Sequence, residues 1–551
     1  MKSQVCIIIN HPNEINYVKK KVLQNYSNVY LYNYYAFKKS GFKDFFTEKN
    51  NIKKYSKIPE YFCKNWFLNY QKNDLHKNKI IGWVLYARLL NKFTETLKIY
   101  IYLKKLKKKF QYFYVSEKLF ENFQNVANCL EINLIVFKSN ITLPEFLSAS
   151  CNKSRSTYSL LPQIHKLSFI ARLLQYFITY FIRNKKVLIA GQFYLHKFKN
   201  YKNFLYLNQI NLLKGFYYKI QNKYKIEANQ FFEINLVKKI FEKKNLETFS
   251  KNFNKKDCYQ IEKIFFDDLL NVYNNGRKFF IWSYVIYKDL LNYYRPTSII
   301  VSGCINFNYI ILNYLAKKDN IKTKVTLDGY SLISRSSEFL FDNKRFIYDY
   351  IYFYGKANKK LFINSKINDE QITKGETILL KKKNYENYDC DYKYDFIVMT
   401  FSPFTDCITS RWDFQTQAVF DVINVLHELK YKKILIKIKP SNLKSELAQK
   451  NYFLSKIKHH NIMIDISTKP FQDVIHYSKN IVGGLSTAVY EAVYFKKNYF
   501  VYHPRQMGLH ELNNFSVVLN KKNIAKNLKD LKKNILNKKT STINNRSFIL
   551  N

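Results

Sequence analysis

Short runs of apolar residues recur along the first two thirds of the chain, separated by longer stretches with a mixed apolar and polar pattern. The runs before residue 191 are unbroken and rich in Val, Ile, Tyr or Phe, which is typical of parallel strands buried on both faces, and the later ones alternate with helical stretches as βαβ units do. The expected strands are Val5–Ile9, Val29–Tyr32, Tyr112–Val115, Leu134–Phe137, Val187–Ala190, Ser298–Ser302, Thr323–Leu327 and Tyr350–Tyr354. Between about Phe198 and Tyr294 the pattern is mostly helical, which predicts a helical insertion.

A polar stretch, Lys381–Tyr394, precedes a second alternation of strands and helices. The strands expected there are Phe396–Thr400, Lys433–Ile438, Ile462–Ile464, Asn480–Val482 and Tyr499–Tyr502. The helices expected between them are Gln415–Lys430, Leu443–Lys458, Phe471–Ser478 and Thr487–Phe495. This βαβ repetition predicts an α/β protein with two Rossmann-like, doubly wound domains. We expect an N-terminal domain over residues 1–382, with the insertion at about 198–294, and a C-terminal domain over 391–551.

Composition supports a globular protein of more than one domain, because 551 residues exceed one ordinary core and 47% of them are hydrophobic. The net charge of +50 is spread along the whole chain, so runs such as Lys104–Lys109 are interpreted as solvated faces. No nucleic-acid-binding signature accompanies them, and no nucleic acid partner is expected. The eight cysteines are scattered without a C-x-x-C pair, which is typical of a reducing compartment.

The location expected is the cytoplasm. The nearest approach to a membrane span, Leu167–Ile182, is shorter than the roughly 20 apolar residues that a span needs and contains Arg172 and Gln175. It is interpreted as a buried or interfacial amphipathic helix. With basic surfaces around it, it suggests peripheral contact with the inner face of the plasma membrane.

The segment Ile481–Pro504 carries the strongest candidate chemistry. It predicts a strand end, a turn at Gly483 and Gly484, and a helix opened by Ser486 and Thr487. Glycine lets a backbone approach a ligand closely, and the free N–H groups of a helix N-terminus favour an anion. A phosphate site is therefore expected, with Glu491 one turn further along the same face accepting from a ribose hydroxyl or forming a surface pair. The alternative is a capped strand–helix turn without a ligand.

Other candidates follow predicted strands, where open parallel sheets bind ligands. Asp328, before Gly329 and Tyr330, is a candidate general base, or else part of an Asp–Gly turn. Lys437 and Lys439 share one strand face, and Lys439 before Pro440 would neutralise a phosphate leaving group, or else both lie on a solvated edge. Thr400 and Ser402 are weaker candidates, which would hold a nucleotide base or phosphate or else belong to an ordinary polar loop. Gly303, at the end of the strand Ser298–Ser302, is a further weak candidate.

Several site classes are disfavoured. The triplet Asp389-Cys390-Asp391 lies in the polar stretch and is too short to indicate a metal site. No cluster of His, Cys and carboxylates has metal-ligand spacing, so no metal cofactor is expected. The chain also lacks the G-x-x-x-x-G-K-[ST] loop and the G-x-S-x-G elbow, which argues against P-loop and α/β-hydrolase chemistry.

Together these motifs resemble GT-B glycosyltransferases, and more specifically bacterial sialyltransferases and capsule polysialyltransferases, which use CMP-activated nonulosonic acids. The matching segments are Leu327-Asp328-Gly329, Lys439-Pro440 and Ser486-Thr487, within Ser298–Pro504. Leu327 stands where those families have an acidic residue and Lys439 where they have His, which replaces a titratable group by a permanent cation. CDP-glycerol phosphotransferases and Kdo transferases of surface polymers have a similar G-x-S-T-A-x-x-E-A segment.

The resemblance implies a metal-independent glycosyltransferase of capsule or lipopolysaccharide biosynthesis. Asp328 would be the base, while Lys439, Ser486 and Thr487 would contact the phosphate of a CMP-sugar donor. The N-terminal domain would bind a glycan or glycolipid acceptor, with Gly303, Gly329 and Tyr330 on that side, and the C-terminal domain the nucleotide sugar. A rival interpretation is a basic, non-catalytic protein that binds nucleic acid or membrane.

Overall fold

The computed structural model divides the chain into two units. The first contains Met1–Lys57, Thr94–Lys153 and Leu380–Asn551, and the second contains Ile58–Phe93 and Ser154–Leu379. The structure describes residues 5–19, 28–32, 41–46, 58–59, 62–63, 79–141, 187–190, 204–206, 222–233, 253–302, 307–326, 341–342, 345–353, 359–360, 362–363, 367–374, 392–400, 412–438, 443–457, 463–486, 488–503 and 518–543.

The first sheet is parallel throughout and has the strand order β3-β2-β1-β4-β5. Its strands are β1 (Val5–Ile9), β2 (Val29–Leu31), β3 (Lys43–Asp44), β4 (Tyr112–Ser116) and β5 (Leu134–Phe137). Numbered along the chain, this is the order 3-2-1-4-5 of a Rossmann half, with a switch point between β1 and β4. Helix α4 (Glu117–Cys129) links β4 to β5, and a 3-10 turn, η1 (Pro12–Tyr17), follows β1.

The second sheet belongs to the other unit and has the order β13-β12-β9-β8-β6-β7. Its strands, all parallel, are β6 (Val187–Ala190), β7 (Phe204–Tyr206), β8 (Ser298–Ser302), β9 (Lys322–Thr326), β12 (Tyr350–Phe353) and β13 (Ile372–Lys374). Along the chain this is 2-1-3-4-5-6, an extended flavodoxin-like order. Helices α7 (Asn222–Phe231) and α10 (Lys255–Tyr294) precede β8, and α11 (Phe307–Lys318) connects β8 to β9.

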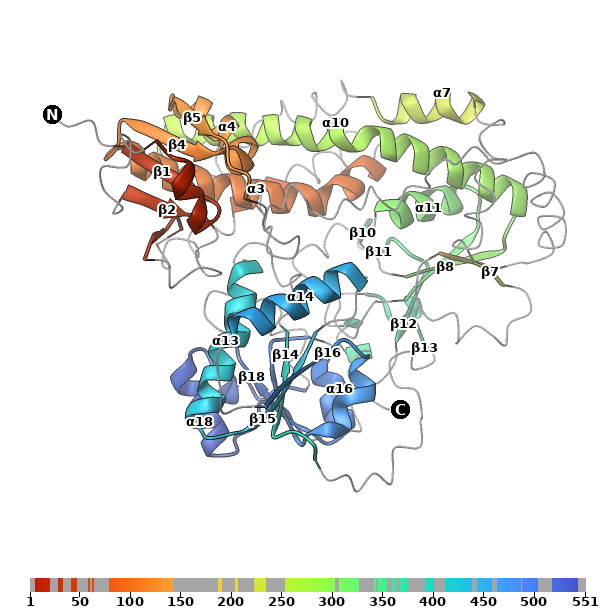
Figure 1. The fold of residues 1–551 in the computed structure, drawn as a ribbon. Coiled ribbons are helices and arrows are strands. Elements are labelled where there is room, and N and C mark those ends of the chain that lie inside the picture. The colour runs from red at the N-terminus through yellow and green to blue at the C-terminus, as the bar shows by residue number, and fades with distance from the viewer. Residues whose placement is uncertain are drawn as a thin grey trace, which may run out of the picture. The chain divides into compact units, whose positions relative to one another are not determined.

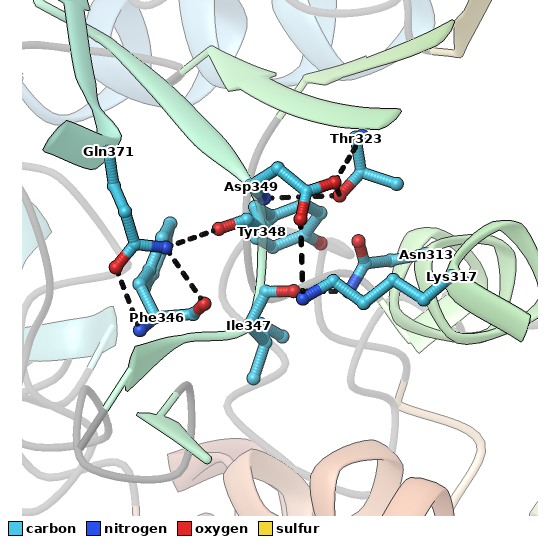
Figure 2. Close-up of polar contacts among 8 residues, drawn as sticks. All are labelled: Asn313, Lys317, Thr323, Phe346, Ile347, Tyr348, Asp349 and Gln371. Atoms are coloured by element: carbon cyan, nitrogen blue, oxygen red, sulfur yellow. Dashed lines mark hydrogen bonds and ion pairs between the residues drawn. The ribbon is translucent and has the colours of Figure 1, made fainter. Parts of the chain in front are cut away.

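Polar side chains at the amino ends of strands in this second sheet form hydrogen bonds to neighbouring segments (Figure 2). Asp349, just before β12, accepts hydrogen bonds from the N–H and hydroxyl of Thr323 at 2.7 and 3.1 Å and pairs with Lys317 of α11 at 3.7 Å. Gln371, just before β13, bonds both main-chain groups of Phe346 and the carbonyl of Tyr348. Because ligands of parallel sheets bind at the carboxyl ends, this network is interpreted as structural.

The third sheet has the order β16-β15-β14-β17-β18, again 3-2-1-4-5, and is parallel throughout. Its strands are β14 (Phe396–Met399), β15 (Lys433–Lys437), β16 (Met463–Ser467), β17 (Asn480–Gly483) and β18 (Asn498–Val501). The helices are α13 (Trp412–Glu428), α14 (Leu443–Lys456), α15 (Phe471–Val474), α16 (Ala488–Tyr494) and α18 (Leu528–Leu536).

Strand alternation sorts the residues of this third sheet between its two faces. Val398, Ile436 and Val482 join a core with residues of α13, α14 and α18. The intervening residues, among them Lys437 and Gly483, point to the opposite face, which α16 covers (Figure 1). Both faces are therefore covered, which explains why these strands are continuous apolar runs.

The α/β class and the Rossmann-like, doubly wound sheets are confirmed. The strands expected within residues 1–382 lie in two separate parallel sheets rather than in one. The helical stretch after Phe198 also contains a strand, β7, that the polar composition concealed. The polar segment 375–391, with Asp389 and Asp391, lies outside the described residues, as does Leu167–Ile182. Within the described part of the chain, no helix is long and apolar enough to cross a membrane.

Candidate functional site

The candidate site lies at the carboxyl edge of the third sheet, where β14 and β17 run side by side. The strand order reverses at this pair, so the edge is a topological switch point, which is where open α/β sheets bind ligands. Thr400 follows β14, and Gly484 follows β17. The structure therefore brings together two segments that the sequence separates by more than 80 residues.

Gly483 is required by the packing beneath this edge. A Cβ atom at Gly483 would lie 2.6 Å from the hydroxyl of Tyr499 and 2.8 Å from Cβ of Met399. Both distances are too short for any side chain. The glycine at the strand end thus makes room for neighbouring side chains, a packing role beside the close approach of a ligand that the sequence predicts.

The hydroxyl of Tyr499 supports the turn that follows. It donates to the carbonyl of Gly484 at 2.9 Å and also bonds the side chain of Ser486. Burial raises the pKa of this phenol, so it stays protonated and remains a donor. Tyr499 carries no motif of its own, and only its place beside a glycine on the adjoining strand signals its role.

Ser486 caps helix α16, as the sequence predicts. Its hydroxyl oxygen accepts the N–H of Ala488 at 3.3 Å, and its carbonyl accepts the N–H of Val489 at 3.0 Å. The side chain is half-buried, which leaves it reachable from the edge. Because Tyr499 donates its single hydrogen to Gly484, the bond between the two hydroxyls uses the hydrogen of Ser486, so this side chain both caps α16 and fixes the turn.

Two ionisable side chains lie under the turn. Glu491 of α16 is 7% exposed, and Lys437 of β15 is 1% exposed. Burial raises the pKa of Glu491 to about 8, and the nearby Lys437 opposes that rise. The ammonium of Lys437 donates to the carbonyl of Ile438, while the carbonyl of Lys437 accepts the N–H and hydroxyl of Thr400 at 3.0 and 3.2 Å.

These positions correct two expectations. Lys437 is buried against the α16 side of the sheet rather than lying on a solvated edge, because strand alternation turns it away from Ile436 and Ile438. Glu491 is buried as well, so a surface ion pair is wrong for it. Its Oε2 atom has no hydrogen-bond partner within the described part of the chain.

Of the residues predicted from sequence, the described structure gathers one set at this edge: Thr400, Gly483, Gly484, Ser486 and Glu491. The others lie outside the described residues: Gly303, Asp328, Gly329, Tyr330, Ser402, Lys439, Pro440 and Thr487. Among the side chains that the structure describes, no group of three His, Cys, Asp or Glu is arranged to hold a metal ion.

Comparisons with known proteins return partial structural likeness only. No protein-family model matches the chain, and no curated protein matches it. A UDP-GlcNAc 2-epimerase of Methanocaldococcus jannaschii, in complex with UDP-GlcNAc and UDP, is 16% identical over 49% of this chain and 78% of its own, with a TM-score of 0.34. MnaA of S. aureus with UDP is 15% identical, covering 48% of this chain and 75% of its own, with a TM-score of 0.33. MurG of Acinetobacter baumannii is 10% identical, with 49% and 72% covered and a TM-score of 0.28. Likeness at this level assigns neither an activity nor a ligand to the chain.

Proposed function

We propose that the chain is an enzyme that binds a nucleotide-activated sugar at the carboxyl edge of the third sheet and transfers the sugar to a glycan hydroxyl. The observation that carries this proposal is the convergence of Thr400 and the Gly483–Ser486 turn at a Rossmann switch point. Such an edge offers main-chain N–H groups and hydroxyls to a phosphate without requiring a metal.

The buried groups beneath the turn support this role. The side chain of Lys437 is buried under the edge, where it opposes the rise in the pKa of Glu491, and its carbonyl holds Thr400 in place. Tyr499 holds Gly484 and Ser486 from below. A turn fixed by two buried neighbours is preorganised, so binding a phosphate would cost little reordering.

The finer assignments rest on the family resemblance. Asp328 would take the proton of the attacking hydroxyl, and Lys439 with Ser486 and Thr487 would stabilise the departing phosphate in a single displacement. The donor proposed is a CMP-activated nonulosonate and the pathway a capsule or lipopolysaccharide, with peripheral membrane contact. A CDP-glycerol-type or Kdo-type donor is the alternative within the same reaction class.

The first experiment is a thermal-shift screen of the full chain with CMP, CDP, UDP and GDP. Stabilisation by one nucleotide, saturating with concentration, is the expected result, because a ligand that binds only the native state raises Tm. CMP would support the nonulosonate donor and CDP the glycerol-type alternative. Equal shifts with all four that vanish at high salt would instead indicate a basic binding protein and overturn the proposal.

Two serine-to-alanine variants test whether the nucleotide binds at the edge of the third sheet. Ser486→Ala should weaken binding of the preferred nucleotide roughly 5- to 30-fold, about 1–2 kcal/mol, by removing a hydroxyl that caps α16 and fixes the turn through its bond to Tyr499. Ser455→Ala is the matched control, because Ser455 is exposed on α14 and its hydroxyl bonds the carbonyl of Tyr452 in the preceding turn. Equal affinities in the two variants would place the nucleotide elsewhere. Asp328→Ala should abolish transfer while leaving nucleotide binding intact, and a wild-type transfer rate would remove the base assignment.

A further inference from the structure

A buried carboxylate occupies the switch point of the first sheet. Glu14 lies in η1, directly after the carboxyl end of β1, and is 1% exposed. β4 runs beside β1 and ends at Ser116, and Ser139 follows the next strand, β5. The crevice at this edge is the place where a Rossmann sheet would otherwise take an anion.

Four donors surround the carboxylate, two for each oxygen. Oε2 accepts the N–H of Asn10 at 2.7 Å and that of His11 at 3.3 Å. Oε1 accepts the hydroxyls of Ser116 at 3.0 Å and Ser139 at 2.9 Å. No lysine or arginine of the described chain pairs with it, so hydrogen bonds alone hold this charge.

The arrangement exceeds a local helix cap. In the capping box of η1, the carboxylate of Glu14 needs to accept only the N–H of His11, while the His11 side chain accepts a main-chain N–H in return. Here Ser116 and Ser139 reach the same carboxylate from 102 and 125 residues further along the chain. Ser116 is also the N-cap residue of α4, and its side chain makes no cap hydrogen bond. Its hydroxyl bonds Glu14 instead, so the carboxylate lies beside the N-cap residue of α4.

We propose that Glu14 is a built-in anion that closes the crevice of the first sheet to phosphate, and that its four donors form an oxyanion cradle. A nucleotide is then admitted at another sheet, in agreement with the edge formed by Thr400 and Ser486. Without Glu14, the cradle should accept a small carboxylate such as formate.

Two substitutions of Glu14 distinguish the effect of its hydrogen bonds from the effect of its negative charge. Glu14→Gln keeps the shape: its amide oxygen can accept both N–H groups, and its NH2 can donate to Ser116 and Ser139, whose hydroxyls rotate and also accept. Glu14→Ala removes the shared acceptor of two buried hydroxyls and two half-buried N–H groups, which destabilises the fold. We therefore expect a small decrease in Tm for Glu14→Gln and a much larger decrease for Glu14→Ala.

Formate tests the cradle directly in the full-length chain. Sodium formate, compared with sodium chloride at equal ionic strength, should raise the Tm of Glu14→Ala in a saturable way and leave the wild type and Glu14→Gln unchanged. Glu95→Ala is the matched control, because Glu95 is also buried but accepts from one side chain, Tyr32. Equal formate effects in Glu14→Ala and Glu95→Ala would overturn the proposal. If Glu14→Ala is recovered insoluble, refolding yield in formate against chloride gives the same comparison, and a yield that formate does not improve counts against the cradle.

A second arm rests on the proposed function. Glu14→Gln should keep the nucleotide response of the wild type, whereas Ser486→Ala should lose it. The reverse outcome would place the nucleotide in the first sheet and overturn the closed crevice. If no nucleotide stabilises the wild type, the proposed function fails, while the formate comparison still decides the cradle.

Discussion

Gly483→Ala should disrupt the candidate site from beneath. The added methyl would meet the hydroxyl of Tyr499 at 2.6 Å and Cβ of Met399 at 2.8 Å. Met399 Cβ is one bond from the backbone of the central strand and cannot rotate away. Tyr499 can move only by giving up its bond to the carbonyl of Gly484. One contact therefore forces a backbone shift, and the other breaks the support of the turn.

The magnitude follows from these two effects. Overpacking a well-filled interior costs typically about 1–3 kcal/mol, and a lost hydrogen bond adds about 1 kcal/mol. We expect the local free energy of unfolding of this sheet to fall by about 2–4 kcal/mol. Nucleotide affinity should fall as well, because the turn at Gly484–Ser486 loses its fixed position.

Hydrogen exchange of amides in β14 and β17 measures the local stability, and calorimetric titration measures the nucleotide affinity. Tyr499→Phe removes one of the two clashes, so the double variant should be less destabilised than the sum of the single variants. Gly41→Ala is the control: its φ of 79° strains any side chain, but open space surrounds it and it lies in the first sheet's region. Wild-type protection in Gly483→Ala, or strict additivity in the double variant, would refute this account of the glycine.

Two further substitutions test the buried polar groups. Folding raises the pKa of Glu491 from 4.5 to about 8, so its ionisation opposes folding, and stability that is present at low pH is lost as the pH rises from 4.5 to about 8. The Tm of Glu491→Gln relative to the wild type should therefore increase between pH 5 and about 8. A constant difference in Tm across this range would contradict the burial argument. Gln371→Ala should leave the main-chain groups of Phe346 and the carbonyl of Tyr348 without their partner, at a cost of about 2–3 kcal/mol. The expected observation is a loss of exchange protection over residues 345–353 with β14 unaffected. Asn229→Ala is the control and should change neither region, because Asn229 is a half-buried residue of α7 that bonds Lys225 and Arg277.

Central strands were predictable because both of their faces are covered. Val5–Ile9 and Val187–Ala190 are unbroken apolar runs, Ser298–Ser302 has an apolar run between two serines, and the structure reproduces the expected bounds of all three. The edge strand β16 continues through Asp465 to Ser467, beyond the expected end at Ile464. The apolar pattern excluded these residues because two of them are polar, but an edge strand accepts polar residues. Division of the N-terminal strands between two sheets was not predictable, since strand pairing between distant segments leaves no local signal.

The same contrast holds for the sites. Gly483 and Ser486 were found because glycine at a strand end and a capping hydroxyl are local features. The burial of Glu491 and the support from Tyr499 depend on side chains of neighbouring strands, which a single sequence does not align. Glu14 lies in an ordinary polar turn, and its two serine partners are more than 100 residues away.

Each of the three parallel sheets is built from one uninterrupted stretch of chain: 5–137, 187–374 and 396–501. During synthesis, the ribosome therefore releases all strands of one sheet before the first strand of the next. In the second stretch, β6 pairs directly with β8, and α7 and α10 lie between them in the chain. β6 therefore has no β8 partner until both helices have been synthesised. We expect this interval to be the slowest in co-translational folding and the one during which β6 most needs protection from aggregation.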